Sequence, residues 1–273
     1  MHPAPASTAS PAAMNMIAAL LEQRTGQQIA ANRTWRIETA LKPLMREREI
    51  DTLDDLIAAL VIARTGELAD LVVDALLNQE TSFFRDAGTL EVIADAVQAM
   101  RAEAPHRRLR IWSAGCSTGQ EPLSLAILLS ERGGGRTAVL PEIIATDVSP
   151  TAVARARAGK YSQFEIQRGL AVRRMIAWFD SAGDDWAANP ELVRKVHFRQ
   201  QNLATEPPPP GKFDVVLCRN VMLYFSGGVR RRVFDTLHAA LRPGGLLVMG
   251  AGETVIGQTD HFAGKIAEVR FYD

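Results

Sequence analysis

The sequence predicts an α/β fold: a parallel sheet covered by helices, preceded by a small all-helical domain and carrying a small inserted subdomain. Two observations predict it. Apolar residues recur at helical spacing as far as about Leu77. From Leu109 onward, short apolar strands alternate with helical segments, which is typical of a parallel sheet. A length of 273 residues is also comfortable for two modest domains.

The helical part is predicted to contain three or four short helices. Turn signals divide it at Thr25-Gly26, at Asp51-Thr52 and at Thr65-Gly66. We expect residues 1–13 to be a disordered tail, 14–77 the helical domain, and 78–108 a linker with a junction helix. The sheet domain is predicted over residues 109–273, with an insertion at 161–201 that fits the strand and helix alternation poorly.

Five strands and four helices are predicted from Gly88 onward. The strands are Leu109–Ser113, Glu142–Thr146, Phe213–Cys218, Gly245–Met249 and an edge strand over Ile266–Tyr272. The helices are Gly88–Glu103, Pro122–Ser130, Pro150–Ala158 and Val229–Leu241. Pro243-Gly244-Gly245 is predicted to break the chain between the last helix and the strand after it.

Composition excludes several classes of protein. Hydrophobic residues at 47% and charged residues at 23% are ordinary globular values, so a disordered chain, a collagen-like repeat and a coiled-coil rod are excluded. The 31 basic residues balance the 31 acidic ones, so we expect no nucleic-acid partner. No apolar run approaches the roughly 18 to 20 residues that span a bilayer, and no secretory signal precedes the helices. We expect a cytoplasmic monomer without membrane insertion.

A glycine-containing loop follows the first predicted strand. Gly115 and Gly119 allow a ligand to approach the backbone closely, as at the first turn of nucleotide-binding α/β folds. A tight turn without a ligand is the alternative. A phosphate-binding P-loop is disfavoured, because no Lys-Ser/Thr pair follows the second glycine.

Polar residues follow two further predicted strands. Asp147 comes directly after Glu142–Thr146, where a carboxylate can accept hydrogen bonds from both ribose hydroxyls, and Ser149 is the better N-cap for the next helix. Arg219, Asn220 and Tyr224 follow the strongest strand. Ligands of open α/β sheets bind outside the carboxyl ends of the strands. The alternative is that Arg219 is a solvated loop charge and Tyr224 a core residue.

The segment Glu80–Arg85 lies at the domain junction. Phe83 and Phe84 are expected to pack between the domains, whereas the polar pair Thr81 and Arg85 brackets them and is a candidate for a cleft. The five histidines share no metal-ligand spacing and the two cysteines form no CxxC motif, so no metal is predicted. No Gly-x-Ser-x-Gly motif supplies a hydrolase nucleophile.

Taken together, five blocks resemble the CheR family of protein-glutamate O-methyltransferases, which modify chemotaxis receptors. The blocks are Glu80–Arg85, Trp112–Pro122, Ala145–Ser149, Asn202-Leu203 and Cys218–Phe225. The resemblance implies an N-terminal helical domain and a Rossmann-like domain that binds S-adenosylmethionine and releases S-adenosylhomocysteine. It also implies methyl esterification of glutamates on the cytoplasmic helical bundle of chemoreceptors.

The resemblance also implies roles for individual residues. Arg85 and Tyr224 would lie nearest the sulfonium and the incoming carboxylate. The implied cofactor contacts are Gln79, Thr81, Arg85, Gly115, Glu121, Asp147, Asn202, Leu203, Arg219 and Asn220. The chain departs from the family at Gln79, where the family usually has Asn, and the neighbouring Asn78 does not restore the register.

Two regions are candidates for binding a receptor. Basic residues cluster in one predicted helical region: Arg33, Arg36, Lys42, Arg46 and Arg48. They suit an acidic partner, but the interleaved Glu38, Glu47 and Glu49 are equally typical of a solvated helix. The insertion stands where the family carries a β-subdomain, which in some members binds a tether peptide at the receptor C-terminus. The sequence leaves open whether this one does.

Three other functions stay open at this point. The same fold can methylate another acceptor, although the helical domain argues against it. A non-catalytic S-adenosylmethionine sensor is disfavoured, because such a module has no need of the polar residues Arg85, Arg219 and Tyr224. An NAD-linked oxidoreductase is the weakest alternative, since the third glycine and the expected spacing to the acidic residue are missing.

Overall fold

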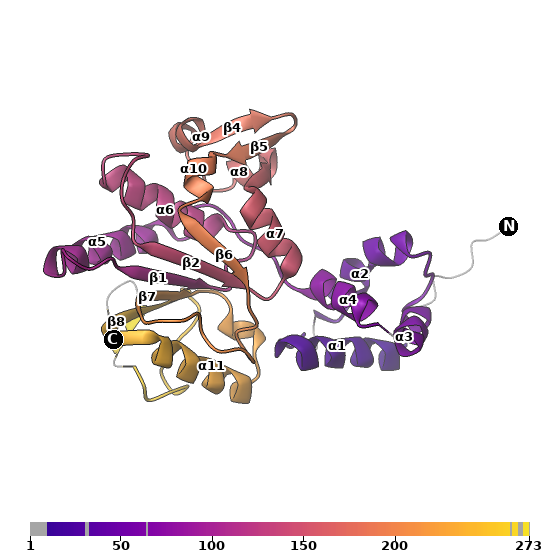
Figure 1. The fold of residues 1–273 in the computed structure, drawn as a ribbon. Coiled ribbons are helices and arrows are strands. Elements are labelled where there is room, and N and C mark those ends of the chain that lie inside the picture. Colours follow the sequence, from indigo (N-terminus) through magenta and orange to yellow (C-terminus); the bar gives the residue numbers. More distant parts are fainter. Residues whose placement is uncertain (1–9, 31–32, 64, 263, 267–269, 273) are drawn as a thin grey trace. The chain divides into compact units, whose positions relative to one another are not determined.

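A computed structural model describes residues 10–30, 33–63, 65–262, 264–266 and 270–272. The chain divides into two compact units (Figure 1). The helical unit comprises Met1–Asn78 together with Tyr224–Ser226. The sheet unit comprises Gln79–Leu223 and Gly227–Asp273. Tyr224–Ser226 thus joins the helical unit although it lies far from it in sequence.

The helical unit contains four helices among its described residues: α1 (Pro11–Thr25), α2 (Trp35–Glu47), α3 (Leu53–Ile62) and α4 (Glu67–Leu76). The predicted turns lie where helices end or begin. Gly26 closes α1 with a left-handed φ of 74°, and Thr52 caps α3 by accepting a hydrogen bond from the amide of Asp55 at 3.1 Å. Side chains from all four helices form its core, among them Ile17, Leu21, Ile37, Leu41, Leu56 and Val72.

The first helix begins earlier than predicted. Ser10 is its N-cap, with Oγ accepting from the amide of Ala13 at 3.1 Å, and Pro11 is its first residue. Ala13 is buried. Residues 10–13 are therefore part of the folded unit rather than of a tail, and the rest of the predicted tail, 1–9, lies outside the described residues.

The sheet unit is built on a sheet of seven strands in its described part, in the order β6-β2-β1-β7-β8-β10-β9. The strands are β1 (Arg110–Ala114), β2 (Glu142–Asp147), β6 (Val196–Gln200), β7 (Phe213–Cys218), β8 (Leu241–Met249), β9 (Gly264–Ile266) and β10 (Arg270–Tyr272). The first five in this order run parallel, and β10 is antiparallel to both of its neighbours. The predicted α/β class is confirmed.

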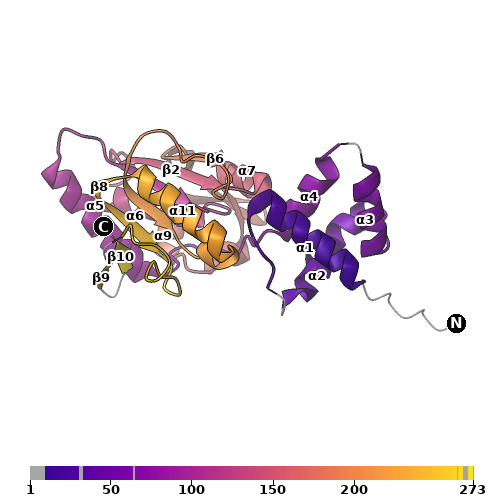
Figure 2. The same cartoon turned by 90° about the horizontal axis from the view of Figure 1, so that it is seen from below.

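Helices cover both faces of the parallel strands. They are α5 (Ala87–Glu103), α6 (Gln120–Arg132), α7 (Pro150–Ala158) and α11 (Gly227–Ala240). Figure 1 shows α6 on one side of the sheet and α11 on the other, and Figure 2 shows α11 from its own side. Every residue of β7 is buried, which explains why this strand, apart from Asp214, is an apolar run without alternation.

Strand β8 corrects a predicted break. Helix α11 ends at Ala240, and β8 begins at once with Leu241 rather than after Pro243-Gly244-Gly245. Its pairing with β7 passes from Leu241 opposite Phe213 to Leu246 opposite Val215. Residues 242–245 therefore bulge opposite Asp214 alone, which accommodates a proline that has no N–H to donate.

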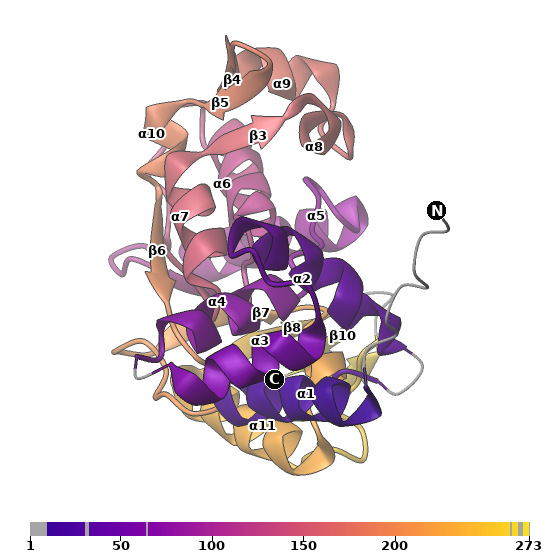
Figure 3. The same cartoon turned by 90° about the vertical axis from the view of Figure 1, so that its right-hand side faces the viewer.

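The insertion forms a small antiparallel sheet in the order β3-β5-β4 (Figure 3). Its elements are β3 (Lys160–Ser162), α8 (Gln163–Gln167), α9 (Val172–Trp178), β4 (Phe179–Ala182), β5 (Asp185–Ala188) and α10 (Pro190–Val193). The predicted boundary at residue 201 is too late, because β6 belongs to the main sheet beside β2. Val196 and Phe198 are buried while His197 and Arg199 are exposed, as expected for a strand with one solvent face.

The end of the chain also differs from prediction. One edge strand was expected over Ile266–Tyr272, but β9 and β10 form an antiparallel pair, and residues 267–269 lie outside the described part. Strand β10 pairs with β8 as well as β9, so β9 is the edge on this side. An antiparallel partner thereby closes the parallel core of the sheet.

Candidate active site

The loops that follow the parallel strands meet at one edge of the sheet. Pairing places Ala114 of β1 opposite Thr146 of β2, and Cys218 of β7 opposite Met249 of β8. The residues after these four positions therefore lie close together, at the edge where ligands of open α/β sheets bind. The sequence motifs at Gly115, Asp147 and Arg219 are all on this edge.

The glycine loop is a tight turn with no room for a side chain at either glycine. Gly115 and Gly119 have φ values of +78° and +94°, in the left-handed region. A Cβ at Gly115 would lie 2.4 Å from Cγ2 of Val221, and one at Gly119 would lie 2.9 Å from Cβ of Ala156. Both glycines are therefore required by the close packing of this turn, which leads straight into α6 at the edge where ligands of open α/β sheets bind.

Asp147 ends β2 and braces the glycine loop. Its Oδ2 accepts from the amide of Ser117 at 2.8 Å, and its Oδ1 accepts from the amide of Ser149 at 2.9 Å. Ser149 caps α7 through the amide of Ala152 at 3.0 Å, as predicted. This places an acceptor-only carboxylate at the ligand-binding edge, a group that suits a diol such as a ribose.

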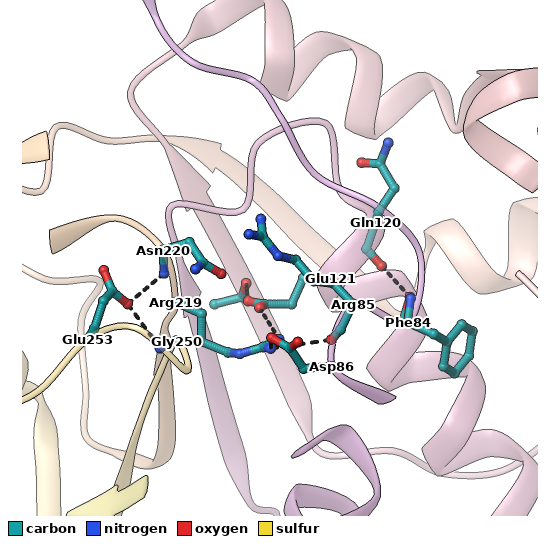
Figure 4. A network of polar contacts seen from close by, with 11 residues as sticks. Phe84, Arg85, Asp86, Gln120, Glu121, Arg219, Asn220, Gly250 and Glu253 are labelled. Carbon is teal, nitrogen blue, oxygen red and sulfur yellow. Dashed lines mark hydrogen bonds and ion pairs between the residues drawn. The ribbon is translucent and has the colours of Figure 1, made fainter. Parts of the chain in front are cut away.

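Arg219 is buried in a network of acidic groups (Figure 4). Its side chain is 2% exposed; Nη1 donates to Oε2 of Glu121 at 2.9 Å and Nη2 to Oδ2 of Asp86 at 2.6 Å. Nη2 also donates to the main-chain oxygen of Arg85 at 3.3 Å. Within the described part of the chain its Nε has no hydrogen-bond partner. The alternative of a solvated loop charge is therefore wrong for Arg219.

Glu121 carries this network to β1. Its other oxygen, Oε1, accepts from Oγ of Ser113 at 2.9 Å. Glu121 and Arg219, both implied cofactor contacts, thus lie side by side and hold each other in place. The network spans the start of α6, the end of β7 and the segment that carries Arg85.

The segment 79–86 adopts a strained backbone around Arg85. Phe84 and Asp86 have φ values of 50° and 54°, a left-handed conformation that costs a non-glycine residue about 1 kcal/mol or more. The amide of Phe84 donates to Oγ of Ser124 at 2.9 Å, and Asp86 is held by Arg219. This strain, confined to the residues on either side of Arg85, is typical of functional sites.

The two aromatics of this segment pack within the sheet unit, which corrects the expectation that they pack between domains. The Phe83 ring is fully buried, with centroids 4.9 Å from Tyr161 and 5.3 Å from Phe179 of the insertion. The guanidinium carbon of Arg174 lies 4.1 Å from the centre of the Phe84 ring. The insertion therefore anchors the segment that carries Arg85.

Gln79 and Arg85 have different surroundings. The Gln79 amide nitrogen donates to Oγ of Ser149 at 3.1 Å, and its main-chain oxygen accepts from Oγ of Ser117 at 3.0 Å. Gln79 thus lies beside the Asp147 turn despite its departure from the family pattern.

The Arg85 side chain is exposed, and among the described residues its guanidinium has no hydrogen-bond or ion-pair partner (Figure 4).

Asn202 and Leu203 follow β6, the neighbour of β2. The amide of Gln201 donates to the main-chain oxygen of Asp147 at 2.9 Å, which joins this turn to the site edge. Asn202 Oδ1 accepts from the amide of Ala204 at 3.0 Å, and Leu203 is buried. The structure thus brings both residues to the edge where Asp147 lies.

Tyr224 belongs to the helical unit. Its hydroxyl accepts from the side-chain amide of Asn78, and its main-chain oxygen accepts from the amide of Gln28 at 2.7 Å. Phe225 forms a β-bridge with Gln27. Tyr224 is half-buried rather than part of the apolar core. The sequence assigns Asn78 no function, since it does not restore the family register at Gln79, and it does not predict the contact of Asn78 with Tyr224.

Sequence reasoning also missed Glu253, which follows β8. This buried carboxylate accepts hydrogen bonds from three backbone amides at the site edge (Figure 4). A signal was present, since an acidic residue four positions after a predicted parallel strand falls on the ligand-binding edge.

The two cysteines are poor nucleophiles. Burial raises the pKa of the Cys116 thiol well above its usual value, and the carboxylates of Asp147 and Glu121 raise it further. Burial also raises the pKa of Cys218, with Glu253 and Glu121 adding to the effect. Both thiols are therefore protonated at neutral pH, so neither is suited to covalent catalysis.

Comparison with known proteins finds relatives over most of the chain. In the part of the chain that the structure describes, no helix is long and apolar enough to cross a membrane. The chain is 36% identical to chemotaxis protein methyltransferase Cher2 of Pseudomonas putida over 247 residues, 89% of this chain and 90% of that protein. It is 36% identical to chemotaxis protein methyltransferase 1 of Pseudomonas aeruginosa over 261 residues, 93% and 94% of the two chains. It is 37% identical to chemotaxis protein methyltransferase 1 of Vibrio cholerae over 245 residues, 89% of each.

The family profile described as "CheR methyltransferase, SAM binding domain" matches residues 79–270. This match begins at Gln79, where the sheet unit begins, and includes every loop of the site edge. The chain belongs to the CheR family of S-adenosylmethionine-dependent methyltransferases.

Proposed function

We propose that this protein esterifies glutamate side chains on the cytoplasmic helical bundle of chemoreceptors, using S-adenosylmethionine as the methyl donor. The observation that carries the proposal is the site edge itself, with Asp147, the glycine loop and the Arg219–Glu121 pair assembled beside Arg85. The names of the relatives support a role in chemotaxis. Because the acceptor lies in the receptor's cytoplasmic part, we place the reaction in the cytoplasm.

The residues of the edge fit the donor. Asp147 would hold the ribose hydroxyls, and the backbone at Gly115 would lie against the nucleoside. Arg219, Glu121, Asn220, Asn202 and Leu203 would surround the rest, together with Gln79 and Thr81. The unpartnered Nε of buried Arg219 supports this assignment, because an orphaned buried donor costs about 1 to 3 kcal/mol unless a ligand satisfies it.

Catalysis in this proposal is a matter of positioning. Bound S-adenosylmethionine supplies an electrophilic methyl group, and a glutamate carboxylate is a nucleophile at neutral pH, so the chain needs no general base. Arg85 orients the incoming carboxylate, since its guanidinium is exposed and uncommitted among the described residues. A tight ion pair would blunt the nucleophile, so we assign Arg85 orientation rather than neutralisation. Holding the reactants in line can supply several kcal/mol of the barrier.

The exposed side of α2 carries charges of both signs, and we propose that its basic residues contact the acidic receptor bundle. Ile37, Leu41 and Leu44 bury one side of α2 in the core. Lys42 and Arg46, one turn apart, are exposed on the other side, where they line a groove of about 870 Å³ together with Glu38 and Glu49. We assign this face to receptor docking, and docking of this kind weakens as salt is raised.

The test is transfer of labelled methyl from S-adenosylmethionine to chemoreceptor-bearing membranes, scored as base-labile methyl ester. The parent is compared with Asp147→Ala and with Asp260→Ala, an exposed aspartate outside the site edge. We expect ester with the parent and Asp260→Ala, and at least a tenfold smaller yield with Asp147→Ala, because about 1.4 kcal/mol of lost binding already corresponds to tenfold. Binding of the donor without ester on any receptor offered would overturn the acceptor assignment and leave the family assignment standing.

A further inference from the structure

Glu253 joins two of the loops at the site edge. It lies 7% exposed, four residues beyond the end of β8. Its Oε2 accepts from the amide of Asn220 at 2.6 Å and from the amide of Gly250 at 2.9 Å, while its Oε1 accepts from the amide of Met222 at 2.8 Å. One side chain therefore satisfies backbone donors both in its own turn and in the turn that follows β7 (Figure 4).

The turn that Glu253 holds is strained and closely packed. Asn220 has a φ of 61°, a left-handed conformation that non-glycine residues adopt at a cost. A Cβ at Gly250 would lie 2.8 Å from Nδ2 of Asn220 and 2.9 Å from Oε2 of Glu253. The two turns thus meet with no room for another heavy atom, and the geometry of Asn220 depends on the carboxylate beneath it.

A carboxylate suits this position better than an amide. Three backbone N–H groups converge on its two oxygens, and a carboxylate offers acceptor sites only. In glutamine, the side-chain NH₂ would face at least one backbone N–H and leave that donor unpaired. An unpaired buried donor costs about 1 to 3 kcal/mol.

We propose that Glu253 is a positioning residue for the cofactor site: through its backbone contacts it holds the turn 219–222 in the conformation that presents Asn220 to S-adenosylmethionine. The inference rests on the proposed function, which assigns Asn220 to that ligand. Its hydrogen bonds with the amides of Asn220 and Met222 are the contacts through which Glu253 holds this turn.

The experiment compares four proteins: the parent, Glu253→Gln, Gly250→Ala and Gly252→Ala. Gly252 is the matched control, because it lies in the same turn as Gly250 but a Cβ there would meet nothing within 4 Å. Affinity for S-adenosylhomocysteine is measured by calorimetry, amide hydrogen exchange is followed in the peptide containing 219–223, and the thermal midpoint is recorded for each.

We expect Glu253→Gln and Gly250→Ala to weaken binding about 5- to 150-fold, the range that follows from one unpaired buried donor. Exchange in 219–223 should rise in the same two variants, while Gly252→Ala matches the parent in both measurements. If the role of Glu253 were purely structural, the two substitutions would lower the thermal midpoint without selectively changing binding and exchange in 219–223. In the double variant Glu253→Gln with Asn220→Ala, the loss of binding free energy should be smaller than the sum of the losses in the two single variants, because both substitutions act on one contact.

Binding within twofold of the parent in both Glu253→Gln and Gly250→Ala would overturn the inference, as would unchanged exchange in 219–223. If both variants lost the fold, Glu253 would be a core support rather than a positioning residue, and this result would also overturn the inference. These readouts need no receptor. Failure of the receptor assignment would leave the parent's S-adenosylhomocysteine affinity intact and is distinguished on that ground.

Discussion

Arg219 and Glu121 form a buried ion pair, with Nη1 of the arginine 2.9 Å from Oε2 of the glutamate. The arginine also reaches Asp86, so one cation from the end of β7 joins α6 to the segment that carries Arg85. The Arg219 side chain is only 2% exposed, so removing either member of the pair would leave a charge in a buried position without its partner, which is costly. The pair therefore links the stability of the sheet unit to the geometry of the site.

Replacing Arg219 tests this link. We expect Arg219→Met to lower the free energy of unfolding by roughly 3 kcal/mol, because Glu121 stays buried without its partner. The measurement is urea denaturation. Arg132→Met is the matched control, since Arg132 also bridges two carboxylates, Glu91 and Asp95, and both are largely exposed. Arg132→Met should lower the free energy of unfolding by about 1 kcal/mol or less. Equal losses in the two variants would contradict a special cost at Arg219.

Gly169 tests the anchoring of the Arg85 segment by the insertion. A Cβ at this position would lie 1.9 Å from the main-chain oxygen of Phe83, so Gly169→Ala must displace the segment. Gly134 is matched in conformation, with a φ of +100° against +99°, and a Cβ there meets nothing within 4 Å. We expect Gly134→Ala to cost about 1 to 2 kcal/mol of stability and leave methyl transfer unchanged.

Gly169→Ala should cost more and also lower kcat, because displacement of Phe83 carries Arg85 with it. Unfolding is followed by denaturation and methyl transfer by release of base-labile label. Identical behaviour of the two alanine variants would show that backbone conformation alone, rather than the contact with Phe83, governs this position.

The variant Arg85→Ala tests the hypothesis that Arg85 orients the acceptor carboxylate. Its side chain is exposed, so Arg85→Ala should keep the thermal midpoint of the parent while kcat falls at least tenfold, since misplacement of a reactant is costly in a reaction that depends on positioning. Arg231→Ala, an exposed arginine on α11, is the control and should retain full turnover. Near-normal turnover of Arg85→Ala with bound receptor is the result that the orientation hypothesis cannot accommodate.

The buried thiols predict a pH dependence of stability. The folded pKa values of Cys116 and Cys218 are raised, so the unfolded chain loses these protons at lower pH than the folded chain does. Their contribution is fully present below the ordinary thiol pKa of about 8.5 and is lost as pH rises above it. We therefore expect the free energy of unfolding to fall between about pH 8 and pH 10.

Denaturation at several pH values measures this, and the variant Cys116→Ala with Cys218→Ala is the control, because it removes both titrating groups. Its stability should fall less steeply over the same interval. Alkylation under native conditions provides a second check, since buried protonated thiols should react far more slowly than the same thiols in urea. Rapid native labelling of either cysteine would contradict the burial that underlies the prediction.

Local features of the fold were predictable from the sequence because they depend on near neighbours. The bounds of α7 and β7 match the prediction, since a proline after a capping serine starts the helix and a run that is apolar except for Asp214 marks a strand buried on both faces. The glycine loop and Asp147 were placed at one edge for the same kind of reason, because carboxyl ends of parallel strands meet there.

Contacts between residues far apart in the chain were decided by the tertiary structure alone. Phe83 was expected between domains and instead packs on Tyr161, and Val196–Gln200 was assigned to the insertion and instead completes the main sheet. For Glu253 the sequence offered only its position after a predicted strand, and its contact with Asn220 depends on β8 lying beside β7. Periodicity shows which face of an element is buried, and capping shows where a helix begins or ends. Which distant side chain covers that face is set by strand order and by where charges such as Arg219 can be neutralised.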